Sequence, residues 1–254
     1  MAVINPAQAA AMFGGIPGVA GDPHALTIPG GVTQVIDVHP ETGYFQDAAK
    51  TVPAASGDPV YTWVEAIGGY DYIQATGANQ PLVSPTVEFG TYRGVICDNV
   101  NDYLRQTSKG ASNPFAMFAV VKFSTLGAAA ECVYSAISGD SLCFAYSNAF
   151  SGNGRARYYL VTASPSLALD MTLNTVYVLG TISNGASSYW LDIDKSWTAL
   201  SASAPTTTAS TLMIRENGTG SPLAGQIARF TQIDGLINTT EAGVIVDELY
   251  ALYS

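Results

Sequence analysis

The stretch Phe115–Phe123 constrains the fold more than any other part of the sequence. It reads Phe-Ala-Met-Phe-Ala-Val-Val-Lys-Phe, and every position except Lys122 is apolar. A short, continuous apolar run of this kind is typical of a strand in the core of a sandwich. Residues 176–182 are likewise apolar and β-branched. We therefore expect both stretches to be buried strands, and Phe115–Phe123 to be central.

Many shorter apolar stretches accompany these two, with Gly, Asn, Asp and Pro turns between them. Asn184-Gly185 is a strong signal for a two-residue hairpin turn. Short strands separated by such turns indicate a sandwich or barrel. We predict an all-β fold of two antiparallel sheets, with a Ser/Thr/Ala-rich loop over residues 198–210. Further strands are expected at residues 32–38, 60–64, 70–75, 87–89, 132–137, 142–146, 155–161, 188–193, 212–215 and 223–233.

The chain ends on a helical pattern. Asn238 is a plausible N-cap, and Glu241 follows three residues later as its capping-box partner. Ile245, Leu249 and Leu252 then recur at helical spacing. We expect an amphipathic C-terminal helix that closes one end or edge of the sandwich.

Residues 1–36 differ from the rest of the sequence. Asn5-Pro6 predicts the start of a short helix to about Phe13, after which Gly and Pro are too dense for regular structure. The stretch nevertheless carries several apolar side chains. We divide the chain into an N-terminal arm, residues 1–36, and a β-sandwich, residues 37–254. The arm has two interpretations: it lies on its own domain, or it docks on another subunit.

Charge and cysteine content exclude several classes of protein. Of the 254 residues, 48% are apolar and only 12% are charged, and the net charge is −10. An acidic chain without a basic cluster is not expected to bind nucleic acid, and no apolar run is long enough for a membrane-spanning helix. The start lacks the basic region of a signal peptide. We interpret Cys97, Cys132 and Cys143 as buried apolar residues, because an odd count argues against a disulfide framework.

Residues 94–104 form a second distinctive stretch. Val95, Ile96 and Cys97 are followed by a polar tip, and Tyr103 and Leu104 then return to the apolar layer. The tip offers four side-chain oxygens, on Asp98, Asn99, Asn101 and Asp102. Oxygen ligands of this kind could hold calcium. The same residue types also make tight turns without a metal, which is the alternative interpretation.

Catalytic sets are hard to assemble from the sequence. Glycoside hydrolysis needs two carboxylates, and Asp192 and Asp194 are a weak candidate pair near a turn. The only histidines, His24 and His39, lie in the arm and at the end of the first strand, so they reach a site only if the arm folds into it. We therefore expect no catalytic residues. Tyrosines in or near loops either bind carbohydrate or pack at the rim: Tyr61, Tyr70, Tyr72, Tyr92, Tyr146, Tyr158 and Tyr159.

Four stretches together resemble a known superfamily. They are residues 45–63, with Phe45-Gln46-Asp47 and Trp63; residues 74–81; residues 95–104; and the closing strands at residues 174–179 and 223–228. In this order they resemble the concanavalin A-like lectin/glucanase superfamily, in the laminin-G-like form common in bacteriophage virion proteins. Residues 95–104 match its turn pattern, with Cys97 in place of an aromatic residue and Asn99 in place of a glycine. The resemblance covers residues 37–254 and implies a two-sheet jelly roll.

The resemblance and the residues together predict a non-enzymatic bacteriophage virion structural protein. It would be a head decoration or a tail appendage, assembled in the host cytoplasm, without a cofactor. Residues 1–36 would bind other virion proteins, and their apolar side chains predict a homo-oligomer. Host-surface glycans are a further expected partner. Two alternatives stay open: a carbohydrate-active enzyme of the same fold, such as a glycoside hydrolase or lyase, and a free cell-surface lectin.

Overall fold

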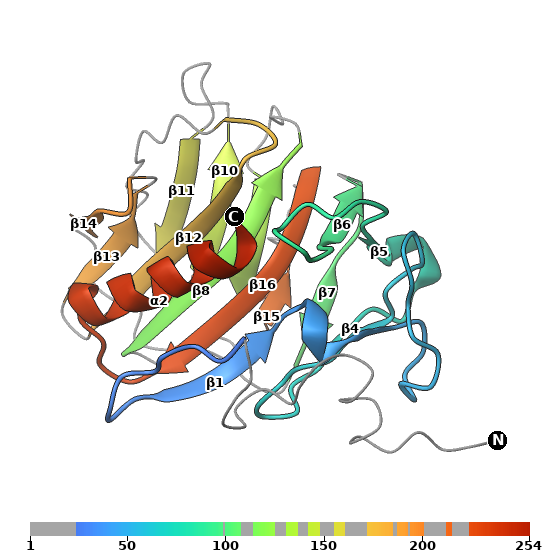
Figure 1. Cartoon of the computed structure of the whole chain (residues 1–254), viewed down its shortest axis with the longest axis horizontal. Coiled ribbons are helices and arrows are strands. Elements are labelled where there is room, and N and C mark those ends of the chain that lie inside the picture. The colour runs from blue at the N-terminus through green and yellow to red at the C-terminus, as the bar shows by residue number, and fades with distance from the viewer. Residues whose placement is uncertain are drawn as a thin grey trace.

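The chain folds as a β-sandwich. The computed structural model describes residues 24–98, 100–107, 114–124, 131–136, 142–147, 155–160, 172–184, 187–192, 194–200, 212–214 and 224–254. These residues form two antiparallel sheets that face each other, with one C-terminal helix (Figure 1). The expected all-β sandwich is confirmed. No helix in the described ranges is long and apolar enough to cross a membrane.

The first sheet is built around the longest strands. Its order is β14-β13-β12-β8-β16-β6-β5. Strand β1 pairs with the part of β16 that extends beyond its pairing with β6. The strands are β1 (Thr33–Val38), β5 (Leu82–Val83), β6 (Val95–Asp98), β8 (Phe115–Phe123), β12 (Val176–Ser183), β13 (Ser188–Leu191), β14 (Trp197–Leu200) and β16 (Ala224–Asp234).

The second sheet has shorter strands. Its order is β11-β10-β9-β15-β7-β4-β3-β2. The strands are β2 (Tyr44–Phe45), β3 (Thr62–Trp63), β4 (Tyr72–Ile73), β7 (Leu104–Gln106), β9 (Glu131–Ala136), β10 (Leu142–Ser147), β11 (Arg155–Leu160) and β15 (Leu212–Ile214). Two short 3₁₀ helices, Pro40–Thr42 and Gly77–Asn79, lie in connections between the two sheets.

Strand β8 is apolar throughout because both of its faces are covered. Side chains alternate across a strand. Phe115, Met117, Ala119, Val121 and Phe123 therefore enter the core between the sheets. Ala116, Phe118 and Val120 enter a second core, which the helix α2 (Thr239–Tyr253) covers on the outer face of the first sheet. The expected central position of this strand is confirmed by its pairing with β12 and β16.

Helix α2 (Thr239–Tyr253) begins with the predicted capping box. The Asn238 side chain accepts hydrogen bonds from the backbone N–H groups of Thr240 and Glu241, and the Glu241 carboxylate accepts one from Asn238 N–H. The helix packs on β12 and β8, across the outer face of the first sheet (Figure 1). The expectation that it closes an end or edge was wrong. Its buried residues, Ala242, Ile245, Val246, Leu249 and Tyr253, need a broad apolar surface.

Three local expectations also need correction. Residues 87–89 form only an isolated bridge between Phe89 and Tyr92. Strand β14 (Trp197–Leu200) includes the first three residues of the predicted loop, 198–210. It pairs with β13, and Trp197 packs on the core beneath α2. A hairpin turning at Gly139-Asp140 would place Cys132 opposite about Ser147, but a bulge between β9 and β10 places it opposite Ala145.

Residues 24–36 of the predicted arm lie on the sandwich. Strand β1 pairs with β16, and Leu26 is buried in the core beneath α2. Thr27 N–H donates to Glu248 Oε2 of α2 at 2.8 Å. Strand β1 thus crosses the boundary that we placed after residue 36. Residues 1–23, including the expected helix from Asn5 to Phe13, lie outside the described ranges, so the division and the attachment role stay predictions.

Candidate functional site

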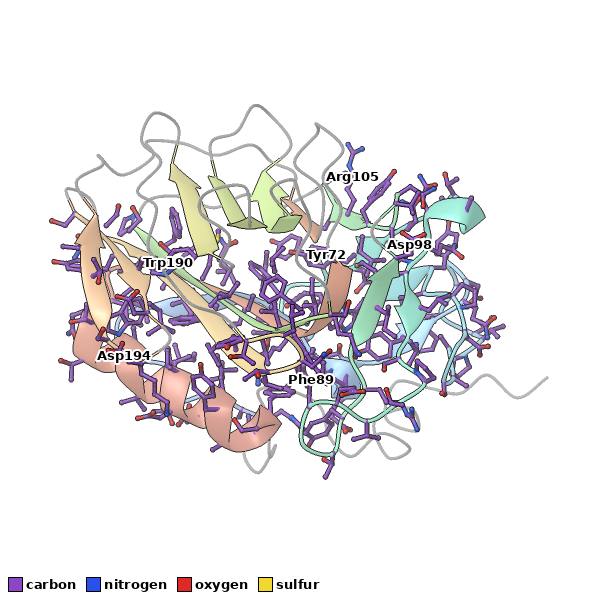
Figure 2. All side chains as sticks on the ribbon, turned by 90° about the horizontal axis from the view of Figure 1, so that it is seen from above. Tyr72, Phe89, Asp98, Arg105, Trp190 and Asp194 are labelled. Atoms are coloured by element: carbon purple, nitrogen blue, oxygen red, sulfur yellow. The ribbon has the colours of Figure 1, made fainter. Side chains whose placement is uncertain are left out.

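A groove lies on the outer face of the second sheet, where β4 meets β7. Ile73 and Arg105 are register partners in these two strands. Alternation sends their neighbours Tyr72 and Leu104 into the core, fully buried, while Ile73 and Arg105 point outward. Figure 2 shows Arg105 projecting from this sheet on the side opposite α2. The pairing of two short strands therefore brings an apolar and a cationic side chain together on one surface.

The groove has a volume of about 520 Å³. By the same alternation, Asp71, Ile73, Tyr103 and Arg105 share the outer face, whereas Gln74 is buried. The groove therefore combines aromatic, apolar, anionic and cationic surface. Its lining residues are Gly69, Tyr70, Asp71, Ile73, Gln74, Ala75, Thr76, Tyr103, Arg105, Gln106 and Thr107.

The carboxylate of the groove is already compensated. Lys50 Nζ lies 2.6 Å from Asp71 Oδ2, and the backbone N–H of Glu65 donates to Asp71 Oδ1 at 2.9 Å. The lysine is held in place by its own turn, in which Asp47 accepts hydrogen bonds from Thr51 N–H, Thr51 Oγ1 and Val52 N–H. These bonds, led by that from the Thr51 hydroxyl, lower the pKa of Asp47.

A buried carboxylate fixes the wall of the groove. Glu65 is 5% exposed, and its two oxygens accept hydrogen bonds from the backbone N–H groups of the loop that carries Gly69 and Tyr70. Ile67 and Gly68 donate to the same carboxylate at 3.0 and 2.5 Å. A loop of exposed, glycine-rich residues would otherwise sample many conformations. Glu65 therefore holds the wall beside the groove in one conformation.

The same carboxylate joins the wall to a buried ion pair. Asp37 N–H donates to Glu65 Oε1 at 2.7 Å. The Asp37 carboxylate accepts two hydrogen bonds from Arg229, from Nε at 2.8 Å and from Nη2 at 2.5 Å. Burial raises the pKa of Asp37, while the Arg229 charge opposes that shift. Arg229 Nη1 also donates to the carbonyl of His24 at 3.0 Å, which ties the residues before β1 to β16.

The two histidines, His24 and His39, meet in the interior. Their rings stack with centroids 5.0 Å apart, and the Tyr92 hydroxyl lies 3.2 Å from His24 Nε2. His39 is fully buried, and neither of its ring nitrogens has a hydrogen-bond partner in the described ranges. Burial, together with the nearby Arg229 charge, lowers the pKa of His39 well below 6.5. His39 is therefore neutral and belongs to the core, away from the groove.

The predicted metal ligands lie on the connection between the two sheets, since β6 belongs to the first sheet and β7 to the second. Asp98 Oδ1 accepts from Val100 N–H and Asn101 N–H, and Asp102 Oδ2 accepts from Asp98 N–H. These are bonds of a turn. Asn99 is outside the described ranges, which contain no group of three or more His, Cys, Asp or Glu placed to hold a metal ion. Calcium binding stays a prediction.

The other candidates from the sequence lie apart from the groove. Asp192 Oδ2 accepts from the Thr198 hydroxyl, and Asp194 Oδ1 accepts from Ser196. Figure 2 places Asp194 near α2 and Arg105 on the opposite layer. Of the tyrosines we named, Tyr70 lines the groove and Tyr72 is buried. Tyr146, Tyr158 and Tyr159 have side chains outside the described part.

Sequence reasoning missed Tyr103 and Arg105. We expected Tyr103 to enter the apolar layer with Leu104, but the two side chains point to opposite faces of β7. Tyr103 is only half-buried and lines the groove. The alternation of Tyr103, Leu104 and Arg105 in the sequence is the signal that could have identified an exposed pair.

Comparison of the fold with solved structures gives matches to glycosidases. A GH54 α-L-arabinofuranosidase matches with a TM-score of 0.62 and 10% identity over 88% of this chain and 64% of its own. Trypanosoma rangeli sialidase matches with a TM-score of 0.55 and 11% identity over 89% of this chain and 34% of its own. The chain thus spans less than two thirds of these enzymes. No protein-family model and no curated protein sequence matches.

A third match covers a whole domain. Domain 4 of AbnA, a GH43 extracellular arabinanase from Geobacillus stearothermophilus, in complex with arabinotriose, matches with a TM-score of 0.54 and 9% identity. The match spans 85% of this chain and 98% of that domain. At such low identity these likenesses establish a shared fold. They show that the sandwich resembles those of carbohydrate-active proteins.

The comparisons contradict the expected function. The matched structures named above are glycosidases or a domain of one, which contradicts the predicted non-enzymatic virion protein and the expected absence of enzymatic activity. None of the matches named above is described as a concanavalin A-like or phage protein. The physical reason for the error is that short turn and strand motifs specify a sandwich, while one sandwich fold serves many functions. The alternative, a carbohydrate-active enzyme, agrees better with these matches.

Proposed function

We propose that this chain is the β-sandwich of a carbohydrate-active enzyme and that the groove between β4 and β7 holds its sugar chain. The groove is the observation that carries the proposal. The fold match to Domain 4 of the arabinanase supports it, because that match spans nearly the whole of a domain described in complex with arabinotriose.

The lining has the chemistry that an oligosaccharide needs. Sugar rings present C–H surfaces to aromatic side chains, and Tyr70 and Tyr103 offer such surfaces while their hydroxyls stay wet. Ile73 contributes apolar floor, being 40% exposed. Asp71 and Arg105 supply an acceptor and donors for hydroxyl groups. The volume of about 520 Å³ is within the range of small-molecule sites.

The groove is assigned to holding the sugar chain rather than to cleaving it. Hydrolysis of a glycosidic bond uses two carboxyl groups about 5–9 Å apart. Among the lining residues, Asp71 supplies the carboxylate, and Lys50 and Glu65 N–H already engage both of its oxygens. A single carboxylate engaged in this way does not supply the pair of carboxyl groups that this reaction uses.

The test measures binding of the full chain to arabinotriose and to a panel of neutral and acidic oligosaccharides, by calorimetry or on a glycan array. We expect Tyr103→Ala to weaken binding about tenfold, because it removes a stacking surface. Tyr103→Phe keeps the ring and serves as the matched control, with little loss expected. Release of reducing ends is measured with the same panel. If the chain neither binds nor cleaves any of these sugars, the proposal is refuted.

A further inference from the structure

Arg105 is the exception among the cations of the described part of the chain. Five of the six Lys and Arg residues whose side chains the structure describes have named partners. Arg105 has an exposed side chain, and among the residues that the structure describes no hydrogen bond or ion pair joins it to a partner. The engaged pairs are Lys50 with Asp71, Arg93 with the carbonyls of Ser84 and Pro85, Lys122 with Glu88, Lys195 with Asp247, and Arg229 with Asp37.

The surroundings of Arg105 favour an anion. Asp71, which shares the groove, is compensated by Lys50 at 2.6 Å. Among the lining residues, Arg105 is therefore the one charged side chain without a counter-charge, in a chain whose net charge is −10. A guanidinium without a counter-charge attracts an anionic ligand, whereas the rest of an acidic surface repels that ligand.

The geometry of the Arg105 side chain indicates which class of anion would fit. A guanidinium presents parallel N–H donors that match the two oxygens of a carboxylate. Arg105 is the register partner of Ile73 and follows Tyr103 by two positions on the same face. Ile73 offers apolar surface to a sugar ring, and Tyr103 offers aromatic surface. A neutral sugar would satisfy only part of the guanidinium through hydroxyl oxygens. We infer that the groove selects a sugar unit that carries a carboxylate, an inference that rests on the proposed carbohydrate function.

The experiment compares matched acidic and neutral probes with the full chain. The pairs are oligogalacturonate with its methyl ester, and sialyllactose with lactose, which separate uronic from sialic acids. Calorimetry gives Kd for the chain and for Arg105→Gln, Arg105→Lys and Lys195→Gln. Lys195 is the control cation, since it pairs with Asp247 of α2 on the opposite side of the molecule. Thermal melting of each variant verifies folding.

We expect one acidic probe to bind about tenfold tighter than its neutral partner, with the difference lost in Arg105→Gln and retained in Lys195→Gln. Arg105→Lys should keep part of the preference, because it retains charge without the paired donors. Equal binding of acidic and neutral probes, weakened by Tyr103→Ala, overturns the acidic specificity and leaves the proposed function standing. Failure of every sugar to bind overturns both.

Discussion

The buried ion pair of Asp37 and Arg229 should dominate the response of this protein to single substitutions. Arg229 is 0% exposed and Asp37 is 3% exposed, and two hydrogen bonds join them. Asp37→Asn keeps the size of the side chain but removes its charge. Arginine cannot lose its proton in a protein, so a buried cation is left uncompensated. Breaking a buried pair in this way costs about 3–5 kcal/mol.

We expect the lower end of that range, about 3 kcal/mol, because the carbonyl of His24 still accepts one of the Arg229 hydrogen bonds. Since a domain has about 5–15 kcal/mol in total, the variant should fold but unfold at lower urea concentration. The Asp37 N–H that bonds to Glu65 is unchanged by the substitution, so the wall of the groove should keep its conformation.

Urea unfolding followed by tryptophan fluorescence measures the effect. The matched control is Asp71→Asn, which removes a carboxylate from the surface pair with Lys50, whose side chain is 42% exposed. That change should cost less than about 1 kcal/mol. The double variant Asp37→Leu with Arg229→Met should recover most of the loss, because apolar residues can replace a buried pair. Equal costs for Asp37→Asn and Asp71→Asn would refute the reasoning.

Four further results are expected. Glu65→Gln should weaken sugar binding and lower stability by about 1–3 kcal/mol in urea titrations, because an amide cannot accept all the N–H groups of the groove wall. Burial lowers the pKa of His39 in the folded state, so the unfolded chain binds a proton at His39 more readily, and the free energy of unfolding should fall as pH drops below about 6.5. His39→Phe should reduce this pH dependence in melting scans from pH 7.5 to 5. Asn238→Ala should cost about 1 kcal/mol of unfolding free energy through the lost cap of α2. Asp102→Ala should lower the free energy of unfolding by about 1 kcal/mol through the lost hydrogen bond from Asp98 N–H. A melting temperature of the unsubstituted protein that rises with added calcium would contradict this purely structural role.

Local patterns in the sequence sufficed for several elements. The boundaries of Phe115–Phe123 as a strand and the capping box at Asn238 and Glu241 follow from residues that are neighbours in the chain. An apolar run identifies a buried strand, and a cap satisfies backbone donors within one helical turn. Such features need no knowledge of the rest of the fold, and both predictions were confirmed.

Features that depend on distant pairing did not follow from the sequence. The turn at Asp98 could as well have joined two neighbours of one sheet, but it crosses from one sheet to the other. Nothing local placed α2 on the face of the first sheet or stacked His24 on His39. Strand register and layer packing are set by contacts between residues far apart in the chain, and a sequence pattern specifies only which side chains share a face.

The sequence by itself therefore determined an all-β sandwich with a capped C-terminal helix, because periodicity and capping are local properties. The tertiary structure alone decided the site. The pairing of Ile73 with Arg105 turned two exposed side chains into the floor of a groove, and the Glu65 carboxylate fixed its wall. It also showed Arg105 without a partner among the described residues, since an ion pair is a property of two positions in space and not of one residue in a sequence.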